Sequence, residues 1–349
     1  MNSFEYEVLR QFPVSHTMVR TIRQIGEYRG KQELFKTQSP QVLETLRQVA
    51  VIQSTECSNR IEGVTAPLAR IKDLIDHKTE PQNRSEQEIA GYRDVLSTIH
   101  TNAPEMMFTK NLVLQLHRDL YQYLPGEGGY WKQVDNEITE TGPGGGSVVR
   151  FTPVPAFKTD DAMERLHAGF SKLLRGQEID PLFLIGTYVL DFLCIHPFRD
   201  GNGRMARLLT LLLIYQAGYD VGRFISLEQI VERTKDSYYD TLYRSSANWH
   251  EGKHSLLPWL EYFLGVVILG AFQEFENLTG LVAGGRGTKT AMVIEVIDRF
   301  SNDFSIGDIQ QRCPTVGIDM IRRVLRQERD EGKITCVGRG PQAKWRKNG

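Results

Sequence analysis

The stretch that most constrains this chain runs from His196 to Arg207, which reads HPFRDGNGRMAR and separates two apolar segments. Before it, apolar residues recur at steps of three and four: Ile185, Tyr188, Val189, Phe192 and Leu193. After it, Met205, Leu208, Leu209, Leu212 and Leu213 restart the same spacing. Because this spacing buries one face of a helix, the sequence predicts two buried helices, the first ended by Pro197, with a polar loop between them.

The polar loop has the residue types of a phosphate site. The Gly201-Asn202-Gly203 tripeptide would stand at the N-terminus of the second helix, where backbone N–H groups and the helix dipole attract an anion. Arg204 and Arg207 are three apart on its first turn, so both are predicted to reach polyphosphate oxygens. Asp200 is placed to hold a Mg²⁺ ion shared with those phosphates. His196 is left as a general base for an incoming hydroxyl.

Each part also has an ordinary structural interpretation. A Gly-Asn-Gly tripeptide alone is typical of a turn, and a single His beside Pro is more often structural. A zinc site at His196 and Asp200 would lack a second His or Cys at ligand spacing nearby. Together, the elements favour phosphate chemistry.

At every defined position the stretch resembles the Fic family motif, His-x-Phe-x-(Asp/Glu)-Gly-Asn-Gly-Arg-x-x-Arg. The resemblance implies a nucleotidyltransferase that moves AMP from ATP onto a Ser, Thr or Tyr hydroxyl of a protein and releases pyrophosphate. In that scheme His196 deprotonates the target hydroxyl, Asp200 holds Mg²⁺ and Phe198 anchors the loop. The implied ATP contacts are Arg199, Asp200, Gly201, Asn202, Gly203, Arg204 and Arg207. The related Doc proteins carry Lys where this chain has Gly203 and act as kinases, so Gly203 favours AMP transfer.

A second motif of the family lies upstream. Residues 41–61 have apolar positions at helical spacing and run into Ser58-Asn59-Arg60-Ile61-Glu62-Gly63. Glycine often terminates helices, so this ending alone is ordinary. The segment resembles the inhibitory pattern (Ser/Thr)-x-x-x-Glu-(Gly/Asn) of Fic proteins, with Ser58 and Glu62 at its defined positions. The resemblance implies that Glu62 pairs with Arg207 in the place of the γ-phosphate and holds ATP in a pose unsuited to in-line attack.

Two further regions acquire roles from the resemblance. Residues 130–155 read as two short extended pieces around a glycine-rich turn. Without a functional role, such a pattern is typical of a surface hairpin. In Fic proteins this position is the flap, which clamps the target segment as an added strand; the implied contacts are Val149, Arg150, Phe151 and Thr152. Tyr239 and Asn248 are the implied adenine contacts, although paired tyrosines in a helix are most often packing residues.

The predicted fold is mainly α: a Fic helical-bundle core with a small β-hairpin flap, plus a C-terminal winged helix-turn-helix domain. We expect an N-terminal helical region over residues 1–110, the core over 111–275, a linker over 276–288 and the C-terminal domain over 289–349.

The C-terminal domain resembles a winged helix-turn-helix, with Asp319 to Gln327 as recognition helix. Arg322, Arg323 and Arg326 would be displayed on that helix. Residues 285–349 hold 13 Lys and Arg against 8 Asp and Glu, a net charge of +5 within a chain of net charge −1. Such a modest basic excess suits DNA, a protein partner or a solvated face.

Composition excludes few classes. The four cysteines, Cys57, Cys194, Cys313 and Cys336, have no C-x-x-C spacing and no disulfide density, which suits a reducing cytoplasm. The N-terminal residues do not resemble a signal peptide, and the most apolar segments are too short to span a bilayer, so we expect no membrane association. The expected partner is a protein substrate of unknown identity, with self-modification and a homodimer as further expectations.

Three functions remain open from the sequence. The first is a self-inhibited protein adenylyltransferase that uses ATP and Mg²⁺. The second is a nucleotide-sensing regulator whose C-terminal domain binds DNA or a partner. The third is removal of AMP from a modified target, with Glu62 positioning the water. An intact His196 favours an enzyme, because a pure sensor requires no general base.

Overall fold

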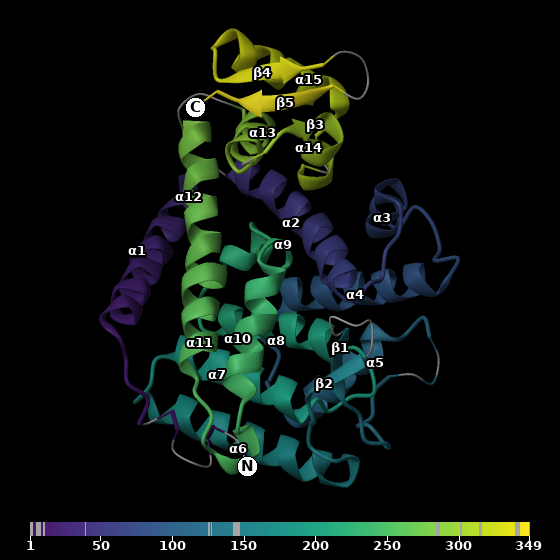
Figure 1. Ribbon diagram of the computed structural model, residues 1–349, viewed down its shortest axis with the longest axis vertical. Helices are drawn as coiled ribbons and strands as arrows, with labels where there is room; N and C mark the ends of the chain where they lie inside the picture. The colour runs from purple at the N-terminus through teal and green to yellow at the C-terminus, as the bar shows by residue number, and fades with distance from the viewer. Residues whose placement is uncertain are drawn as a thin grey trace.

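The structure is a computed structural model, and it describes residues 3–4, 8–9, 11–38, 40–124, 126, 128–141, 147–283, 287–300, 302–313, 316–338 and 343–348. Helices dominate this part of the chain, as predicted, and the only sheets in it are small (Figure 1). The N-terminal helices are α1 (His16–Gln38), α2 (Pro40–Ile61), α3 (Leu68–Ile75), α4 (Arg84–Asn102) and α5 (Lys110–Leu120). None of the described helices is both long and apolar enough to cross a membrane.

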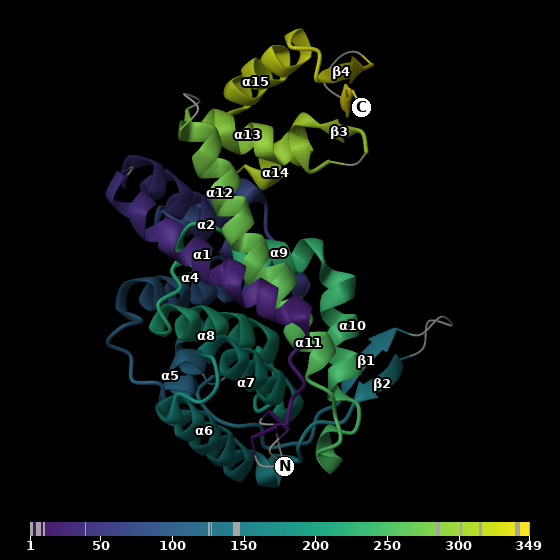
Figure 2. The same cartoon turned by 90° about the vertical axis from the view of Figure 1, so that its left-hand side faces the viewer.

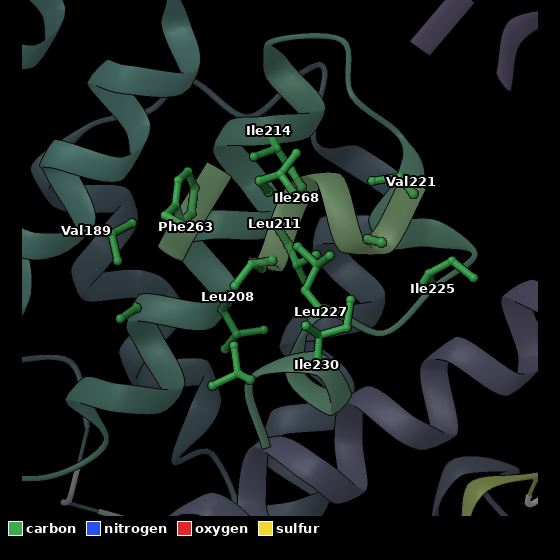
Figure 3. Packing of buried hydrophobic residues seen from close by; sticks show 14 of the residues in the cluster. Val189, Leu208, Leu211, Ile214, Val221, Ile225, Leu227, Ile230, Phe263 and Ile268 are labelled. Carbon is green, nitrogen blue, oxygen red and sulfur yellow. The ribbon is translucent and has the colours of Figure 1, made fainter. Parts of the chain in front are cut away.

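The centre of the fold is the helix pair α7 (Pro181–Ile195) and α8 (Asn202–Gln216), the two buried helices that the sequence predicts. Asp180 caps α7 by accepting a hydrogen bond from the Leu182 N–H, and Pro181 occupies the first turn, where no N–H is needed. Leu208 and Leu211 of α8 pack among Val189, Phe263 and Ile268 from neighbouring helices (Figure 3). Truncating one such buried leucine to alanine costs about 2–5 kcal/mol, so this pair gives the loop between its helices a rigid base.

Further helices surround the central pair. They are η1 (Ala156–Lys158), α6 (Thr159–Gly176), η2 (Val221–Arg223), α9 (Leu227–Arg233), α10 (Lys235–Ser246), η3 (Trp249–Glu251), α11 (Leu257–Glu261), the π-helical η4 (Tyr262–Ile268) and α12 (Leu269–Ala283). Helix α2 lies across α4 and α9, which brings the end of α2 to the start of α8. Helix α1 runs along α12 in both views (Figures 1 and 2).

The expected hairpin is present as β1 (Ile138–Thr141) and β2 (Ser147–Phe151), which pair antiparallel. The glycine-rich tip, residues 142–146, lies outside the described residues. The side chain of His250 holds the far end of β2, because its ring stacks on Phe151 at 5.4 Å and its Nε2 lies 2.8 Å from the Thr152 carbonyl oxygen.

The C-terminal residues form a small separate layer above α2 and the end of α12 (Figure 2). Its elements are α13 (Thr288–Asp298), β3 (Phe304–Ser305), α14 (Ile306–Arg312), α15 (Ile318–Asp330), β4 (Ile334–Val337) and β5 (Lys344–Lys347), with sheet order β3-β5-β4. Most of the expected linker is helical, since α12 continues through Ala283 where the sequence prediction placed residues 276–288 outside the core. Glycines 284 and 285 and Arg286 lie outside the described residues.

Candidate active site

A cavity of about 640 Å³ lies where the end of α2, the hairpin, α7, α8 and α10 meet. Of the candidate site residues, its wall contains Glu62, Arg150, Phe151, His196, Gly203, Arg207 and Tyr239. Segments far apart in the sequence therefore bring a candidate base, a candidate anion site and an aromatic ring to one hollow. A cavity of this size accommodates a nucleotide-sized ligand.

His196 directly follows α7 and lies in the left-handed backbone region, with φ of 51°. Its Nδ1 lies 3.3 Å from the Leu193 carbonyl oxygen, which accepts the Nδ1 proton and leaves Nε2 as the basic nitrogen. Burial, reinforced by the nearby charge of Lys132, lowers the pKa of His196 to about 4. The imidazole is consequently neutral at pH 7, the form that a general base needs.

The residues between His196 and α8 hold one another. The ring of Phe198 stacks on the ring of His117 at 3.6 Å with 4° between their planes. Asn202 accepts a hydrogen bond from the Phe198 N–H and donates one to the Phe198 carbonyl oxygen, both at 2.9 Å. Gly201, with φ of 79°, makes the turn into α8. The Asn202 side chain therefore locks the loop and does not line the cavity.

Arg207 is buried and already has three bonds to the end of α2. Its Nη2 lies 2.8 Å from Glu62 Oε1 and 2.9 Å from the Ser58 carbonyl oxygen, and its Nε donates to Ser58 Oγ at 2.8 Å. Burial opposes the charge on Arg207, but Glu62 together with the neighbouring Tyr238 and Tyr92 outweighs burial and keeps the arginine pKa above its ordinary value. The guanidinium thus stays charged, with one carboxylate as its anion.

Arg204 differs from the sequence prediction. Its guanidinium donates to Glu88 Oε2 at 2.6 Å and to the Tyr121 hydroxyl at 2.8 Å, and it lies outside the cavity wall. Helix α4 supplies Glu88, so the first arginine of the motif ties α8 to α4 while the second faces the cavity. The prediction that both arginines reach one anion therefore does not match the geometry.

The remaining candidates lie around the cavity without lining it. Asp200 and Arg199 are exposed on the loop, and Asp200 Oδ1 accepts a hydrogen bond from the Gly201 N–H at 2.6 Å. Val149 and Thr152 flank the lining residues of the hairpin. Asn248 differs from its predicted place in the adenine pocket: its backbone is left-handed, with φ of 58°, where the chain turns from α10 into η3, and its side chain is not in the cavity wall.

Other lining residues escaped the sequence prediction. Asp236, Asp240 and Tyr243 share one face of α10 with Tyr239 and also line the cavity. Asp236 and Tyr243 are three and four residues from Tyr239, and Asp240 is four residues from Asp236, so helical spacing is a signal that could have found them. Arg150 lies over the Tyr243 ring at 4.5 Å and connects this wall to the hairpin.

Comparisons with known proteins point to one family. The model of the Fic/DOC family matches residues 107–214, which include the whole loop of the candidate site. Over 193 residues the chain is 28% identical to the protein adenylyltransferase Fic of Drosophila erecta. This alignment covers 52% of this chain and 36% of that protein. It is 25% identical over 179 residues to the corresponding protein of Nematostella vectensis, covering 49% of this chain and 39% of that protein. The chain thus spans little more than a third of the length of these curated relatives.

Solved structures show the same fold. A Fic family protein from Desulfovibrio desulfuricans G20 superposes with a TM-score of 0.63 at 22% identity, over 97% of this chain and 98% of that one. A Fic domain containing signaling protein from Bacteroides thetaiotaomicron gives a TM-score of 0.62 at 20% identity, over 76% of this chain and 98% of that one. At these identities the likeness establishes fold alone.

Proposed function

This chain carries a Fic/DOC family domain over residues 107–214, and we propose that it transfers AMP from ATP to a Ser, Thr or Tyr hydroxyl of a protein. The observation that carries the proposal is the shared cavity of His196, Gly203 and Arg207, in which a neutral imidazole stands beside an anion site. The curated relatives named as protein adenylyltransferases support the same activity.

In the proposed reaction, His196 removes the proton of the target hydroxyl through Nε2. The hydroxyl oxygen then forms a bond to the α-phosphorus of ATP, and the bond from that phosphorus to the bridging oxygen breaks to release pyrophosphate. Arg207 and the backbone N–H groups at the start of α8 would hold the β- and γ-phosphates. Tyr239 offers a ring for stacking on adenine, and the carboxylates of Asp236 and Asp240 can accept hydrogen bonds from its amino group.

The loop from His196 to Gly203 offers one carboxylate to a Mg²⁺ ion, that of Asp200. No group of three His, Cys, Asp or Glu residues that could hold a metal occurs among the described residues. The exposed carboxylate of Asp200 is nevertheless suited to a cation that keeps most of its waters and takes its other ligands from phosphates. We therefore propose Asp200 as the single protein ligand of a Mg²⁺ ion that would neutralise charge on the departing pyrophosphate.

The Glu62–Arg207 ion pair supports self-inhibition. A guanidinium engaged by a carboxylate and by Ser58 cannot give the same donors to a γ-phosphate. We propose that Glu62 excludes the productive position of ATP until the end of α2 moves. Removal of AMP from a modified target, with Glu62 positioning the water, is the alternative for the same contact.

Two finer expectations stay proposals. The hairpin would clamp the target through the free edge of its strands, with Val149, Arg150, Phe151 and Thr152 nearest the cavity. Residues 289–349 would be a winged-helix interaction module, because α15 presents Arg322, Arg323 and Arg326 to solvent. The cytoplasmic location and the homodimer remain predictions from the sequence.

ATP labelled on the α-phosphate tests the function. We expect weak self-labelling by the native chain, much stronger labelling by Glu62→Gly, and none by Glu62→Gly with His196→Ala. Label transferred from the γ-phosphate instead would identify a kinase. If the Glu62→Gly protein binds ATP but labels neither itself nor a lysate, the nucleotide-sensing regulator replaces the transferase.

A further inference from the structure

Residues 132–136, which precede the hairpin, hold the loop that carries His196 through hydrogen bonds. The Lys132 N–H donates to the Pro197 carbonyl oxygen at 2.9 Å, and Lys132 Nζ donates to the Ile195 carbonyl oxygen at 3.2 Å. The Asn136 side chain donates to the Phe198 carbonyl oxygen at 3.1 Å. Three backbone carbonyls on the two sides of His196 are therefore held by residues 132–136.

Lys132 is unusual in this segment because its charge is buried. Its exposed fraction is 2%. Among the described residues, its recorded side-chain partners are the Ile195 carbonyl and Asn136 Oδ1, the latter at 2.7 Å, and no carboxylate lies within ion-pair distance of it. Burial, opposed in part by Asp135, lowers the pKa of Lys132 to about 8. An apolar side chain would avoid this cost of burying a cation, so the position calls for an explanation beyond packing.

We propose that Lys132 is a positioning residue for His196: with Asn136, it fixes the left-handed turn at the end of α7 and holds the imidazole toward the cavity. For its catalytic consequence the inference rests on the proposed AMP transfer. A backbone at φ of 51° is unfavourable for a residue with a side chain and persists only where its surroundings hold it. The Ile195 and Pro197 carbonyls, on the two sides of His196, are both held by Lys132.

The charge of Lys132 has a second effect at the same place. The charged groups that act on His196 are Lys132, Glu62 and Asp200. Lys132 disfavours the imidazolium, and the two carboxylates favour it. The ammonium thus helps to keep His196 neutral and able to accept a proton.

The same residues connect His196 to the hairpin. Asn136 lies two residues before β1, which begins at Ile138, and both Ile138 and His196 line the cavity. A displacement of the start of β1 would reach the His196 turn through Asn136 and Lys132. Asn136 and Lys132 therefore connect the start of the hairpin to the His196 turn through hydrogen bonds.

The test compares full-length variants in the Glu62→Gly background. Lys132→Met nearly keeps the length of the side chain and removes its charge and its side-chain hydrogen bonds to Ile195 and Asn136, while the backbone bond to Pro197 remains. We expect kcat for AMP transfer to fall by about tenfold or more, with the KM for ATP changed by less than about twofold. We also expect the pKa of His196, followed by NMR of labelled histidine and assigned with His196→Ala, to rise by roughly half a unit or more.

Two further variants sharpen the result. Asn136→Leu keeps the Lys132 charge but removes one of the two hydrogen bonds to the Phe198 carbonyl, since Asn202 still donates there, and it removes the Asn136 partner of Lys132 Nζ. We expect this variant to lower kcat without raising the His196 pKa. Lys110→Met is the matched control, because Lys110 pairs with Asp160 and Glu164 on the surface and should leave both quantities unchanged. If Lys132→Met is unfolded by circular dichroism, Asn136→Leu decides: an unchanged kcat overturns the proposal.

The outcomes separate this proposal from the proposed function. A Glu62→Gly parent that transfers no AMP refutes the function, and the NMR titration then judges Lys132 alone. A His196 pKa in Lys132→Met within about 0.2 units of the parent overturns the positioning role in that case. With an active parent, a folded Lys132→Met protein of normal kcat overturns it as well.

Discussion

The carboxylate of Glu62 occupies the space that a side chain on Gly203 would need. A Cβ built on Gly203 would lie 2.2 Å from Glu62 Oε1 and 3.3 Å from an Nη of Arg207. Glycine at this position therefore leaves room for the Glu62–Arg207 ion pair in its present geometry, apart from any role in binding phosphate. Gly203 and Glu62 are 141 residues apart in the sequence, and the missing side chain of Gly203 makes room for Glu62 Oε1.

Gly203→Ala should destabilise the native chain by about 0.5–1 kcal/mol, because the new methyl group must push the flexible end of the Glu62 side chain away from Arg207 and weaken a partly exposed ion pair. In a Glu62→Gly background the same substitution should cost much less, since the colliding atom is gone. Urea denaturation of the four proteins measures this non-additivity. Gly270→Ala is the control, because its Cβ would meet nothing within 4 Å. Equal costs in both backgrounds would contradict the steric relation.

Glu62→Gly should bind ATP about tenfold more tightly than the native chain, since Arg207 no longer has a competing carboxylate. Isothermal titration calorimetry with ATP measures the change. Glu56→Gln is a useful comparison, because Glu56 pairs with Arg60 on the same helix but does not line the cavity. Equal ATP affinities of native and Glu62→Gly proteins would show that the ion pair does not restrain the site.

Replacing Arg204 by lysine should lower stability, whereas replacing Arg207 by lysine should lower ATP affinity. Arg204→Lys loses one of the two donors that bind Glu88 and Tyr121, and we expect a stability loss of about 1–3 kcal/mol with ATP affinity preserved. Arg207→Lys, tested with Glu62→Gly, should weaken ATP binding by about tenfold. Thermal denaturation and calorimetry on both proteins check this division. Loss of ATP affinity in a stable Arg204→Lys protein would restore the sequence-based role of Arg204.

Stability should fall as pH drops from about 6.5 to about 4. Burial lowers the pKa of His117, His167, His196 and His254 to about 4 and that of His100 to about 3. In this pH range the unfolded chain binds more protons at these histidines than the folded chain, so acid favours unfolding. Asp191, whose pKa burial raises to about 6, and Glu56, whose pKa burial also raises, oppose the trend of the five histidines. Urea midpoints between pH 7 and 4.5 test the sign, and a midpoint that stays constant or rises toward pH 4.5 would contradict it.

The sequence was most informative where the signal is local. Helical spacing on both sides of residues 196–207 predicted α7, α8 and the loop between them, because buried helices repeat their apolar residues regularly. The same reasoning could not separate Arg204 from Arg207. Both stand on the first turn of α8, and which one faces the cavity depends on Glu88, which lies on α4 and 116 residues upstream of Arg204.

Residues in irregular segments were harder to find. Lys132 and His117 hold the loop through backbone carbonyls and ring stacking, and neither belongs to a spacing pattern that marks such a contact. Asn248 lies in a left-handed turn between α10 and η3, outside the regular spacing of α10, and its side chain is not in the cavity wall. Part of the expected linker over residues 276–288 is helical, because α12 continues to Ala283.

Glu62 directly follows the last residue of α2, and its N–H is bonded only to the Asn59 carbonyl of the preceding turn. Helix ends fray at far lower free energy than a domain unfolds. Opening that single turn would carry the carboxylate out of the cavity while the core stays intact. Under the proposed inhibition, the residual AMP transfer of the native chain would be set by how often the end of α2 opens. This residual activity should follow the rate of hydrogen exchange at residues 59–64. It should also change when a ligand binds α2 anywhere along its length.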